Sequence, residues 1–226
     1  MLKERKETLL NELQEKFPIS QFYIDEPMKK HTTFKIGGLA DIYVEVAADE
    51  LQALIEFLKS IDQDFIVIGN GSNILVSDDG IEGVVIAVGK LASRIDIQGC
   101  DVFVDAGTLL ANLANIVAQS GLGGLEFASG IPGTVGGAVF MNAGAYGGEI
   151  KDVLKSVQFI NEDGKLEELP VDELDLSYRH SVFMEKGGFI KGAKFSLYPA
   201  DKDQLKAKMD DIRASRAQKQ PLNFPS

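Results

Sequence analysis

The sequence holds a single cysteine, Cys100, and no tryptophan. One thiol forms no intramolecular disulfide, and without neighbouring Cys or His residues it forms no zinc site of the usual kind. We therefore predict no metal centre. A chain without disulfides suits a reducing compartment, and we expect a cytoplasmic protein.

Positive charge is also scarce, because 23 Lys and Arg residues stand against 34 Asp and Glu residues, for a formal net charge of -11. Binding to nucleic acid would need a clustered basic surface, so this class of partner is excluded. No apolar run approaches the roughly 18 residues of a membrane-spanning helix, and residues 1–17 are too charged for a signal peptide. Membrane insertion is not expected, and the oligomeric state stays open.

Periodic apolar residues predict a helix and then a small β-α-β-β module in the first ninety residues. The helix is indicated by Leu9, Leu10, Leu13 and Phe17. Alternation over residues 41–46 predicts a half-buried strand, and Asp49 with Gln52 is typical of the start of a second helix over 51–58. Further strands are expected at 65–68 and 84–88, and the module ends near Gly89.

The remaining chain predicts a second module. We expect a strand at 102–105 and a helix over 109–117 that Gly121 ends in the left-handed conformation. Further strands are expected at 153–160 and 189–198, with a hairpin turn at Asp163-Gly164 and helical composition over 201–218. The predicted class is α+β with two lobes: a helical segment at 1–27, lobe 1 at 28–89, lobe 2 at 90–200, and the start of a third domain at 201–226.

A first glycine-bearing loop follows the strand at 65–68. Small residues there let several backbone N–H groups turn outward together, which forms a nest for anionic oxygens without any lysine. A plain surface turn is an equally good interpretation of this loop alone. It is neither a Walker loop nor the dinucleotide fingerprint. The candidate anion-binding residues are Gly69, Asn70, Gly71, Ser72 and Asn73.

A second loop, residues 126–149, is longer and dense in glycine. We expect a structureless tract, and such a tract inside a compact domain is usually functional or disordered; the apolar content argues against disorder. Close approach of the backbone to a large flat ligand would explain the missing side chains. The candidate ligand-binding residues are Gly130, Ile131, Pro132, Gly133, Thr134, Gly136 and Gly137.

Four motifs occur in one order: residues 37–41, 69–75, 130–138 and 142–147. From about Met28 onward they resemble the UDP-N-acetylenolpyruvoylglucosamine reductase family, in its shorter branch. That family has the two-lobed FAD-binding fold of the vanillyl-alcohol-oxidase (PCMH) type, followed by a substrate-binding domain. The resemblance implies FAD between the lobes, with its pyrophosphate on the first loop and its isoalloxazine near the second.

The segment 177–183 matches the family's Tyr-Arg-x-Ser-x-Phe motif, and the resemblance implies that Arg179 is catalytic. In the family, NADPH reduces FAD, and UDP-N-acetylglucosamine enolpyruvate then receives the hydride. A permanently charged guanidinium suits stabilisation of the negative charge that develops on the substrate; a structural ion pair is the alternative for Arg179. Tyr146 and Tyr178 are candidate substrate contacts, and His31 is a packing or flavin-proximal residue.

The resemblance also implies a proton-donating serine and a glutamate beyond Ser226, which itself matches a different serine. If these 226 residues are the whole molecule, we expect FAD binding without turnover, because a proton donor contributes about 10²–10⁴ in rate. Two alternatives are a non-catalytic FAD-binding fragment and another oxidoreductase of the same flavin superfamily.

Overall fold

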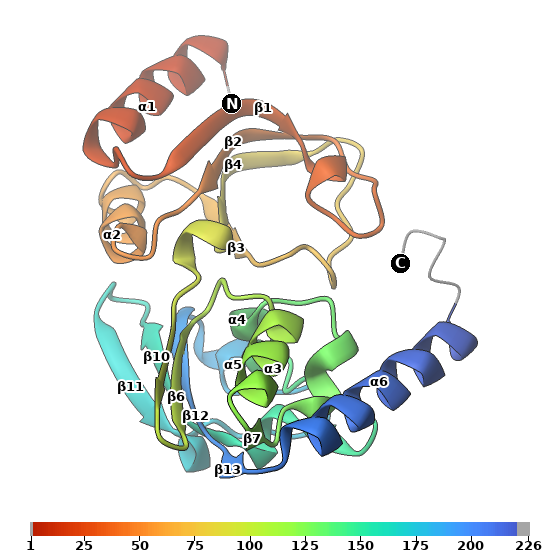
Figure 1. Cartoon of the computed structure of the whole chain (residues 1–226). Coiled ribbons are helices and arrows are strands. Elements are labelled where there is room, and N and C mark those ends of the chain that lie inside the picture. Colours follow the sequence, from red (N-terminus) through yellow and green to blue (C-terminus); the bar gives the residue numbers. More distant parts are fainter. Residues whose placement is uncertain (1, 221–226) are drawn as a thin grey trace. The chain divides into compact units, whose positions relative to one another are not determined.

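The computed structural model describes residues 2–220, which form two compact units (Figure 1). The first unit runs through Ala92 and the second begins at Ser93, close to the boundary at 89/90 expected from the sequence. Each unit has its own sheet and its own core. Among residues 2–220, no helix is long and apolar enough to cross a membrane.

The first unit begins with helix α1 (Lys3–Lys16), which buries Leu9 and Leu13 as its periodicity predicts. Strand β1 (Gln21–Pro27) follows and pairs antiparallel with β2 (Leu39–Glu45). The expectation of helical structure throughout 1–27 is therefore wrong for its last seven residues. The strand lies at the edge of the sheet and keeps a polar, half-exposed sequence, so it lacks the strong apolar signal of an inner strand.

The sheet of the first unit has the order β1-β2-β4-β3, in which β4 (Ile81–Ala87) is parallel to both β2 and β3 (Phe65–Ile68). Strand β2 is an inner strand and is buried on both faces, including Tyr43, so the half-buried strand expected there is wrong. Aliphatic residues alternate with Tyr43 and Glu45 along β2, but this alternation is not matched by alternating burial. A short 3₁₀ turn, η1 (Met28–Lys30), leads from β1 toward β2.

Helix α2 (Leu51–Ser60) buries the apolar face that the sequence predicts, at Leu51, Leu54, Ile55 and Leu58. Its N-cap residue is Glu50, and Asp49 does not hold that position. The Glu50 carboxylate accepts hydrogen bonds from the N–H groups of Ile19 and Ser20, so it fastens the segment before β1 and does not cap its own helix.

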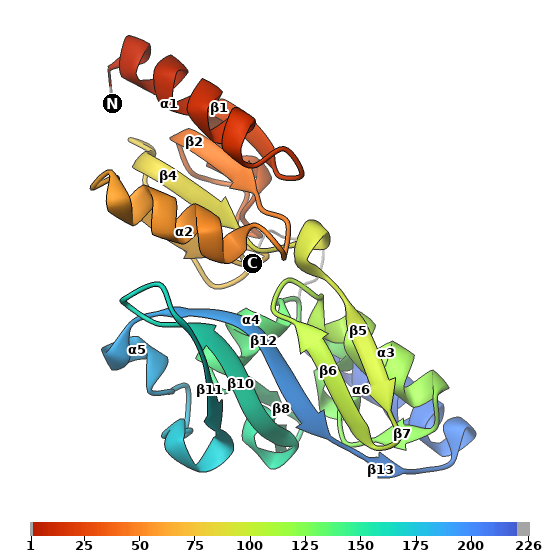
Figure 2. The same cartoon turned by 90° about the vertical axis from the view of Figure 1, so that its left-hand side faces the viewer.

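The second unit contains a five-stranded antiparallel sheet (Figure 2). Its order is β11-β10-β12-β6-β5, with β5 (Ile95–Gln98), β6 (Asp101–Asp105), β10 (Leu154–Ile160), β11 (Leu166–Pro170) and β12 (Phe189–Ser196). The predicted hairpin turn joins β10 to β11, and Gly164 adopts φ +82° there. Two-stranded pairs add β7 (Leu122–Gly123) with β13 (Tyr198–Pro199) and β8 (Gly144–Ala145) with β9 (Gly148–Glu149).

Helix α3 (Leu110–Gln119) ends as expected, with Gly121 at φ +76°. Helix α6 (Lys202–Lys219) packs against α3 and against the 3₁₀ turn η3 (Glu126–Gly130), burying Leu205, Met209 and Ile212. Residues 202–219 therefore belong to the second unit and do not begin a third domain. The last part of the expected third domain, 221–226, lies outside the described residues.

The glycine-dense tract is not structureless. It contains η3, helix α4 (Val135–Phe140) and the β8–β9 hairpin. Short 3₁₀ turns η2 (Lys90–Ala92), η4 (Ile150–Asp152) and η5 (Val171–Glu173) and a one-turn helix, α5 (Phe183–Lys186), complete the described elements. The sequence hid α4 because two of its six residues are glycines, which lower helix propensity.

Candidate functional site

The first glycine loop is fastened to the segment that follows η1. The N–H group of Thr33 donates to the carbonyl oxygen of Gly71 at 3.1 Å. A β-carbon on Gly71 would lie 1.9 Å from the carbonyl oxygen of His31, and the residue has φ +60°. Only glycine fits this position, because a side chain would collide with backbone.

Four backbone amide donors of this loop have no partner in the described part of the chain. Among residues 2–220, no hydrogen bond uses the N–H groups of Gly69, Gly71, Ser72 or Asn73. A series of unused backbone donors beside glycine is what an anion nest requires. This geometry supports the interpretation as an anion site over the plain surface turn.

The second glycine loop is built differently, because its own protein contacts use the N–H groups at the start of α4. Val135 donates to Thr108 and Gly136 donates to Ala106, both through backbone carbonyls, and Gly137 donates to the Thr134 hydroxyl. Thr134 is thus the N-cap of α4. These three N–H groups are not free donors for an anion.

Internal packing already requires glycine at two positions of the second loop, Gly136 and Gly148. The expectation that a flat ligand accounts for the missing side chains is not needed at these two positions. A β-carbon on Gly136 would lie 2.9 Å from the β-carbon of Ala106, and one on Gly148 would lie 2.7 Å from the Phe127 ring. Gly137 is different. The nearest atom to its β-carbon position is the Thr134 hydroxyl oxygen at 3.6 Å, and the residue is exposed.

Three buried hydroxyl groups in the described part of the chain have no hydrogen-bond partner, and each lies beside a glycine loop. The backbone N–H group of Thr33 donates to Gly71 of the first loop, and the backbone carbonyl oxygen of Thr108 accepts from the Val135 N–H group of the second. Ser129 is part of η3. Unsatisfied buried hydroxyls are costly, and a bound polar ligand would satisfy them. Sequence reasoning missed Thr33 and Thr108, because only burial without a partner distinguishes them from ordinary threonines.

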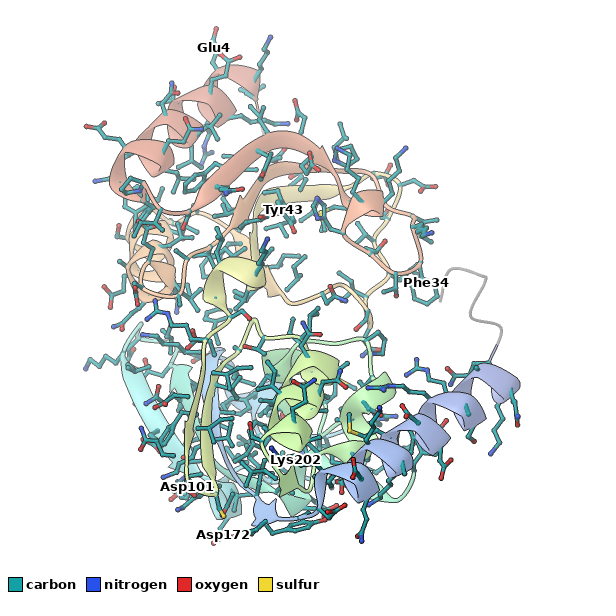
Figure 3. The ribbon with its side chains drawn as sticks, viewed as in Figure 1. Glu4, Phe34, Tyr43, Asp101, Asp172 and Lys202 are labelled. Carbon is teal, nitrogen blue, oxygen red and sulfur yellow. The ribbon has the colours of Figure 1, made fainter. Side chains whose placement is uncertain are left out.

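His31 packs inside the first unit. Its ring stacks on Tyr43 with 4.0 Å between centroids, and its Nε2 lies 3.0 Å from a Glu26 carboxylate oxygen. Figure 3 labels Tyr43 in the first unit. Burial raises the pKa of Tyr43, so this phenol stays protonated. The stacked pair supports the segment that carries the Thr33 contact to the first loop.

Arg179 occupies the tip of a tight turn in the second unit. Ser177 and His180 exchange backbone hydrogen bonds of 3.3 and 3.2 Å across it, and Arg179 itself has φ +56°. Tyr178 is 86% exposed, and the Arg179 guanidinium carbon lies 5.8 Å from its ring centroid. None of the ion pairs within residues 2–220 includes Arg179. A structural ion pair, the alternative role for this residue, is therefore absent from the described structure.

Asn142 links the Arg179 turn to the second glycine tract. Its Nδ2 donates to the Ser177 carbonyl oxygen at 2.9 Å and to the Glu149 carboxylate at 2.8 Å. Hydrogen bonds from Lys151 and Asn142, together with the positive charge of Arg179, hold the pKa of Glu149 below its usual value. The carboxylate thus stays ionised near Arg179.

Tyr146 lies at the tip of the β8–β9 hairpin, which carries Glu149, and is 48% exposed. Asn142, Tyr146 and Arg179 all have positive φ, at 39°, 50° and 56°. Left-handed backbone is uncommon for residues other than glycine and tends to gather at functional sites. Arg179 and Tyr178 therefore lie on the turn that Asn142 contacts, Tyr146 lies on the hairpin that carries Glu149, and residues 69–73 lie in the first unit.

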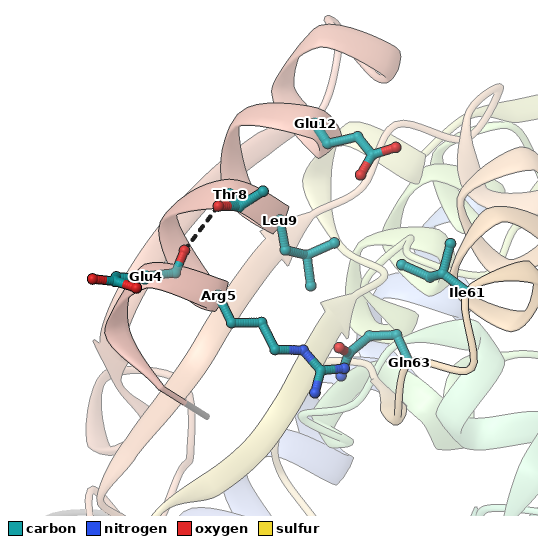
Figure 4. Close-up of a pocket in the computed structure, with 7 residues that line it drawn as sticks. All are labelled: Glu4, Arg5, Thr8, Leu9, Glu12, Ile61 and Gln63. Atoms are coloured by element: carbon teal, nitrogen blue, oxygen red, sulfur yellow. Dashed lines mark hydrogen bonds between the residues drawn. The ribbon is translucent and has the colours of Figure 1, made fainter.

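Two further observations delimit the site. No group of three or more His, Cys, Asp or Glu side chains within residues 2–220 is placed to hold a metal ion. A groove of about 470 Å³ lies away from both glycine loops and is lined by Glu4, Arg5, Thr8, Leu9, Glu12, Ile61 and Gln63 (Figure 4). None of these lining residues belongs to either glycine loop or to the Arg179 turn.

Comparison with known proteins decides the family. Residues 41–170 match the FAD binding domain family, which covers both glycine loops. The chain is 49% identical to the UDP-N-acetylenolpyruvoylglucosamine reductase of Agathobacter rectalis, over 97% of its own length and 74% of that protein. It belongs to the UDP-N-acetylenolpyruvoylglucosamine reductase family. The resemblance predicted from the four motifs is confirmed.

Other members of the reductase family agree. The protein of Caldanaerobacter subterraneus is 42% identical over 97% of this chain and 73% of its own length. The crystal structure of the Thermus caldophilus reductase superposes with a TM-score of 0.74 at 32% identity, covering 89% of this chain and 70% of that one. An alkyldihydroxyacetonephosphate synthase, with TM-score 0.61 and 17% identity over 85% of this chain and 40% of its own, shares the fold. Together with the match to the FAD binding domain family and the Thermus caldophilus structure, this confirms the predicted fold class.

Proposed function

We propose that this chain binds FAD and takes part in the NADPH-dependent reduction of UDP-N-acetylglucosamine enolpyruvate to UDP-N-acetylmuramate, a step of peptidoglycan precursor synthesis. Family membership, with the relatives' printed activity, supports the reaction. The observation that carries the site assignment is the set of unused donors at Gly69, Gly71, Ser72 and Asn73. The single cysteine suits the cytoplasm as the location.

The residues present fit FAD. The four free amides of the first loop suit the pyrophosphate, because neutral backbone donors hold an anion even in a protein with a net charge of -11. The unpartnered hydroxyls of Thr33 in the first unit, and of Thr108 and Ser129 in the second, suit hydrogen bonds to a polar ligand. Gly137 offers an open surface for close approach to a flat ring. Bound FAD would supply hydride transfer between NADPH and the substrate.

Within the second loop, we propose different roles for the candidate residues. Thr134 and Gly136 serve the fold, because Thr134 caps α4 and Gly136 packs on Ala106. Of the other candidates, we assign ligand contact to Gly137 and to the turn formed by Gly130, Ile131, Pro132 and Gly133. Ser129 joins them because its buried hydroxyl has no partner among residues 2–220.

Arg179 is suited to the substrate. Hydride delivery to the enolpyruvyl group places negative charge on the adjoining carboxylate, and a fixed guanidinium fork stabilises that charge. The exposed Arg179 has no carboxylate partner at ion-pair distance within residues 2–220, so it remains free to meet an anion. Tyr178 and Tyr146 present exposed rings in the second unit and are proposed as substrate contacts.

The test is to purify the chain, add FAD, and record the visible flavin spectrum before and after addition of UDP-N-acetylglucosamine enolpyruvate. NADPH oxidation is then followed with and without that substrate. The proposal expects a yellow protein whose spectrum the substrate perturbs. Where the assayed protein also carries the family's proton-donating serine, the proposal expects NADPH oxidation that depends on the substrate. A folded protein that takes up no FAD would contradict the proposal at its base.

Two partial outcomes identify the alternatives. FAD uptake without any spectral response to the UDP-sugar would indicate another oxidoreductase of the flavin superfamily. FAD uptake with a spectral response but no substrate-dependent NADPH oxidation would indicate a non-catalytic FAD-binding protein.

A further inference from the structure

Asn142 stands at the junction between helix α4 and the Arg179 turn. It is 2% exposed, directly follows the C-cap residue of α4, and has φ +39°. Asparagine tolerates the left-handed conformation better than most residues, because its short polar side chain bonds to nearby backbone. A buried residue under this strain is held there by the contacts of its side chain.

The amide of Asn142 uses both of its donor hydrogens and its oxygen. Nδ2 donates to the Ser177 carbonyl oxygen and to the Glu149 carboxylate, and Oδ1 accepts from the Lys151 N–H group at 3.0 Å. The reversed orientation would set an oxygen against two acceptors and an NH₂ group against a donor, so only one orientation is consistent. The side chain is therefore a fixed three-way connection.

A second connection flanks the same turn. The Ser181 hydroxyl, in a fully buried residue, donates to the carbonyl oxygen of Phe140 at 2.6 Å. Phe140 is the last residue of α4, and Asn142 lies two residues beyond it. The Arg179 turn is thus fastened on both sides, at Ser177 and at Ser181, to the C-terminal end of the helix whose first turn carries Gly137.

We propose that Asn142 is a positioning residue for the reductase reaction: it holds the Ser177–His180 turn, and through it Arg179, in the geometry that meets the substrate carboxylate. This inference rests on the proposed function. It adds a residue that touches neither substrate nor flavin and acts only through the Ser177 carbonyl. Glu149, on the other donor hydrogen of the same amide, fixes the amide from the β8–β9 side.

The primary variant is Asn142→Asp. It keeps the size, tolerates the left-handed backbone and can still accept from Lys151, but it cannot donate to Ser177 and it places two carboxylates together at Glu149. Asn161→Asp is the matched control. Asn161 also donates to a glutamate, Glu167, and accepts from backbone N–H groups, but in the β10–β11 hairpin turn.

Two readouts are measured on each purified, FAD-supplemented protein. Hydrogen exchange by mass spectrometry reports the N–H groups of Ser177 and His180, which close the turn. We expect Asn142→Asp to accelerate their exchange about tenfold, the effect of losing one hydrogen bond, and Asn161→Asp to leave it unchanged.

The second readout separates flavin reduction by NADPH from reoxidation by UDP-N-acetylglucosamine enolpyruvate. Asn142→Asp should keep the first rate and slow the second by about 10- to 100-fold.

The double variant Asn142→Asp/Glu149→Gln separates tethering from charge repulsion. It removes the facing carboxylates but cannot restore the donor to Ser177. Positioning through Ser177 predicts that reoxidation stays slow, whereas full recovery would overturn the proposal. If Asn142→Asp does not fold, Asn142→Gly replaces it, because glycine accepts the left-handed conformation and also lacks the donor.

The outcomes distinguish this inference from the proposed function. Unchanged exchange at Ser177 and His180 in the folded variants overturns the tether, whatever the activity. Faster exchange with an unchanged reoxidation rate overturns the positioning role. If the wild-type chain binds FAD but its reduced flavin does not react with the substrate, the proposed function is contradicted, and so is the positioning role in that reaction. The hydrogen-bond connection from Asn142 to Ser177 is then tested by the exchange data alone.

Discussion

The carbonyl oxygen of His31 occupies the space that a β-carbon on Gly71 would need, at 1.9 Å. Two backbone segments about forty residues apart therefore touch without any side chain between them. The Thr33 N–H group completes the contact by donating to Gly71. This close approach shapes the loop whose amides we assign to the FAD pyrophosphate.

Gly71→Ala should prevent FAD uptake and destabilise the protein by about 3 kcal/mol or more, because left-handed strain and a backbone clash act together. Gly99→Ala is the control. Gly99 also has positive φ, at +65°, but nothing lies within 4 Å of its β-carbon position, so we expect only about 1–2 kcal/mol. Urea unfolding and visible flavin absorbance measure the two effects. Equal losses in both variants would contradict the clash.

Gly137→Ala should have opposite effects on the free and the FAD-bound protein. Without FAD, a helical glycine in open space gains about 0.5–1 kcal/mol of stability on replacement by alanine. With FAD, the added methyl group would lie on the proposed ring-facing surface and weaken FAD binding. Gly136→Ala, where the β-carbon would crowd Ala106, should instead destabilise the free protein. Thermal unfolding with and without FAD checks both, and unaltered FAD affinity in Gly137→Ala would remove this residue from the site.

Arg179→Ala should keep FAD bound and reducible by NADPH, while substrate reduction falls by about 10²–10³-fold, the usual effect of removing one group that stabilises developing charge. Arg179→Lys should recover only part of this loss, because an ammonium group lacks the planar donor fork. Rapid-mixing measurements of the two half-reactions provide the test. Substrate reduction at the wild-type rate in Arg179→Ala would refute the catalytic assignment.

Lys6 joins α1 to the sheet of the first unit through ion pairs of 2.6 Å with Asp25 and with Asp41. Its hydrogen bonds to these carboxylates raise the pKa of Lys6 above its ordinary 10.5. Burial would raise the pKa of Asp41, but the hydrogen bonds from Lys6 and from the Gly83 N–H group outweigh it and hold that pKa below 3.8. Both shifts favour the charged forms in the folded state.

Lys6→Met should therefore cost about 2 kcal/mol of unfolding free energy at neutral pH. The difference from wild type should persist between about pH 4 and pH 10. It should shrink as pH falls through the lowered pKa of Asp41 and as pH rises through the raised pKa of Lys6. Lys3→Met is the control, because Lys3 is exposed and lies 3.9 Å from Glu7 in the same helix. Urea unfolding across this pH range tests the assignment, and a pH-independent difference would contradict it.

Local patterns predicted much of the fold. Helical spacing located α1, α2 and α3, composition located α6, and glycine ended α3 where a left-handed residue is needed. Edge strand β1 and helix α4 escaped prediction because neither carries a strong periodic apolar signal. The burial of Tyr43 on the second face of β2 also escaped, because exposure depends on which strands become neighbours.

Glycine motifs in a fixed order are a local, linear signal, and they were enough to identify the family and the residue types of the candidate site. The partners of those residues depend on the three-dimensional fold. The fold leaves the N–H groups of Gly69, Gly71, Ser72 and Asn73 without a partner among residues 2–220. It uses N–H groups at the start of α4 for hydrogen bonds within the protein, and it buries the hydroxyls of Thr33, Thr108 and Ser129 without partners in the same described part of the chain. It also fastened the Arg179 turn to Asn142, 35 residues earlier in the chain. Hydrogen-bond satisfaction is a property of three-dimensional neighbours, which spacing along the chain does not encode.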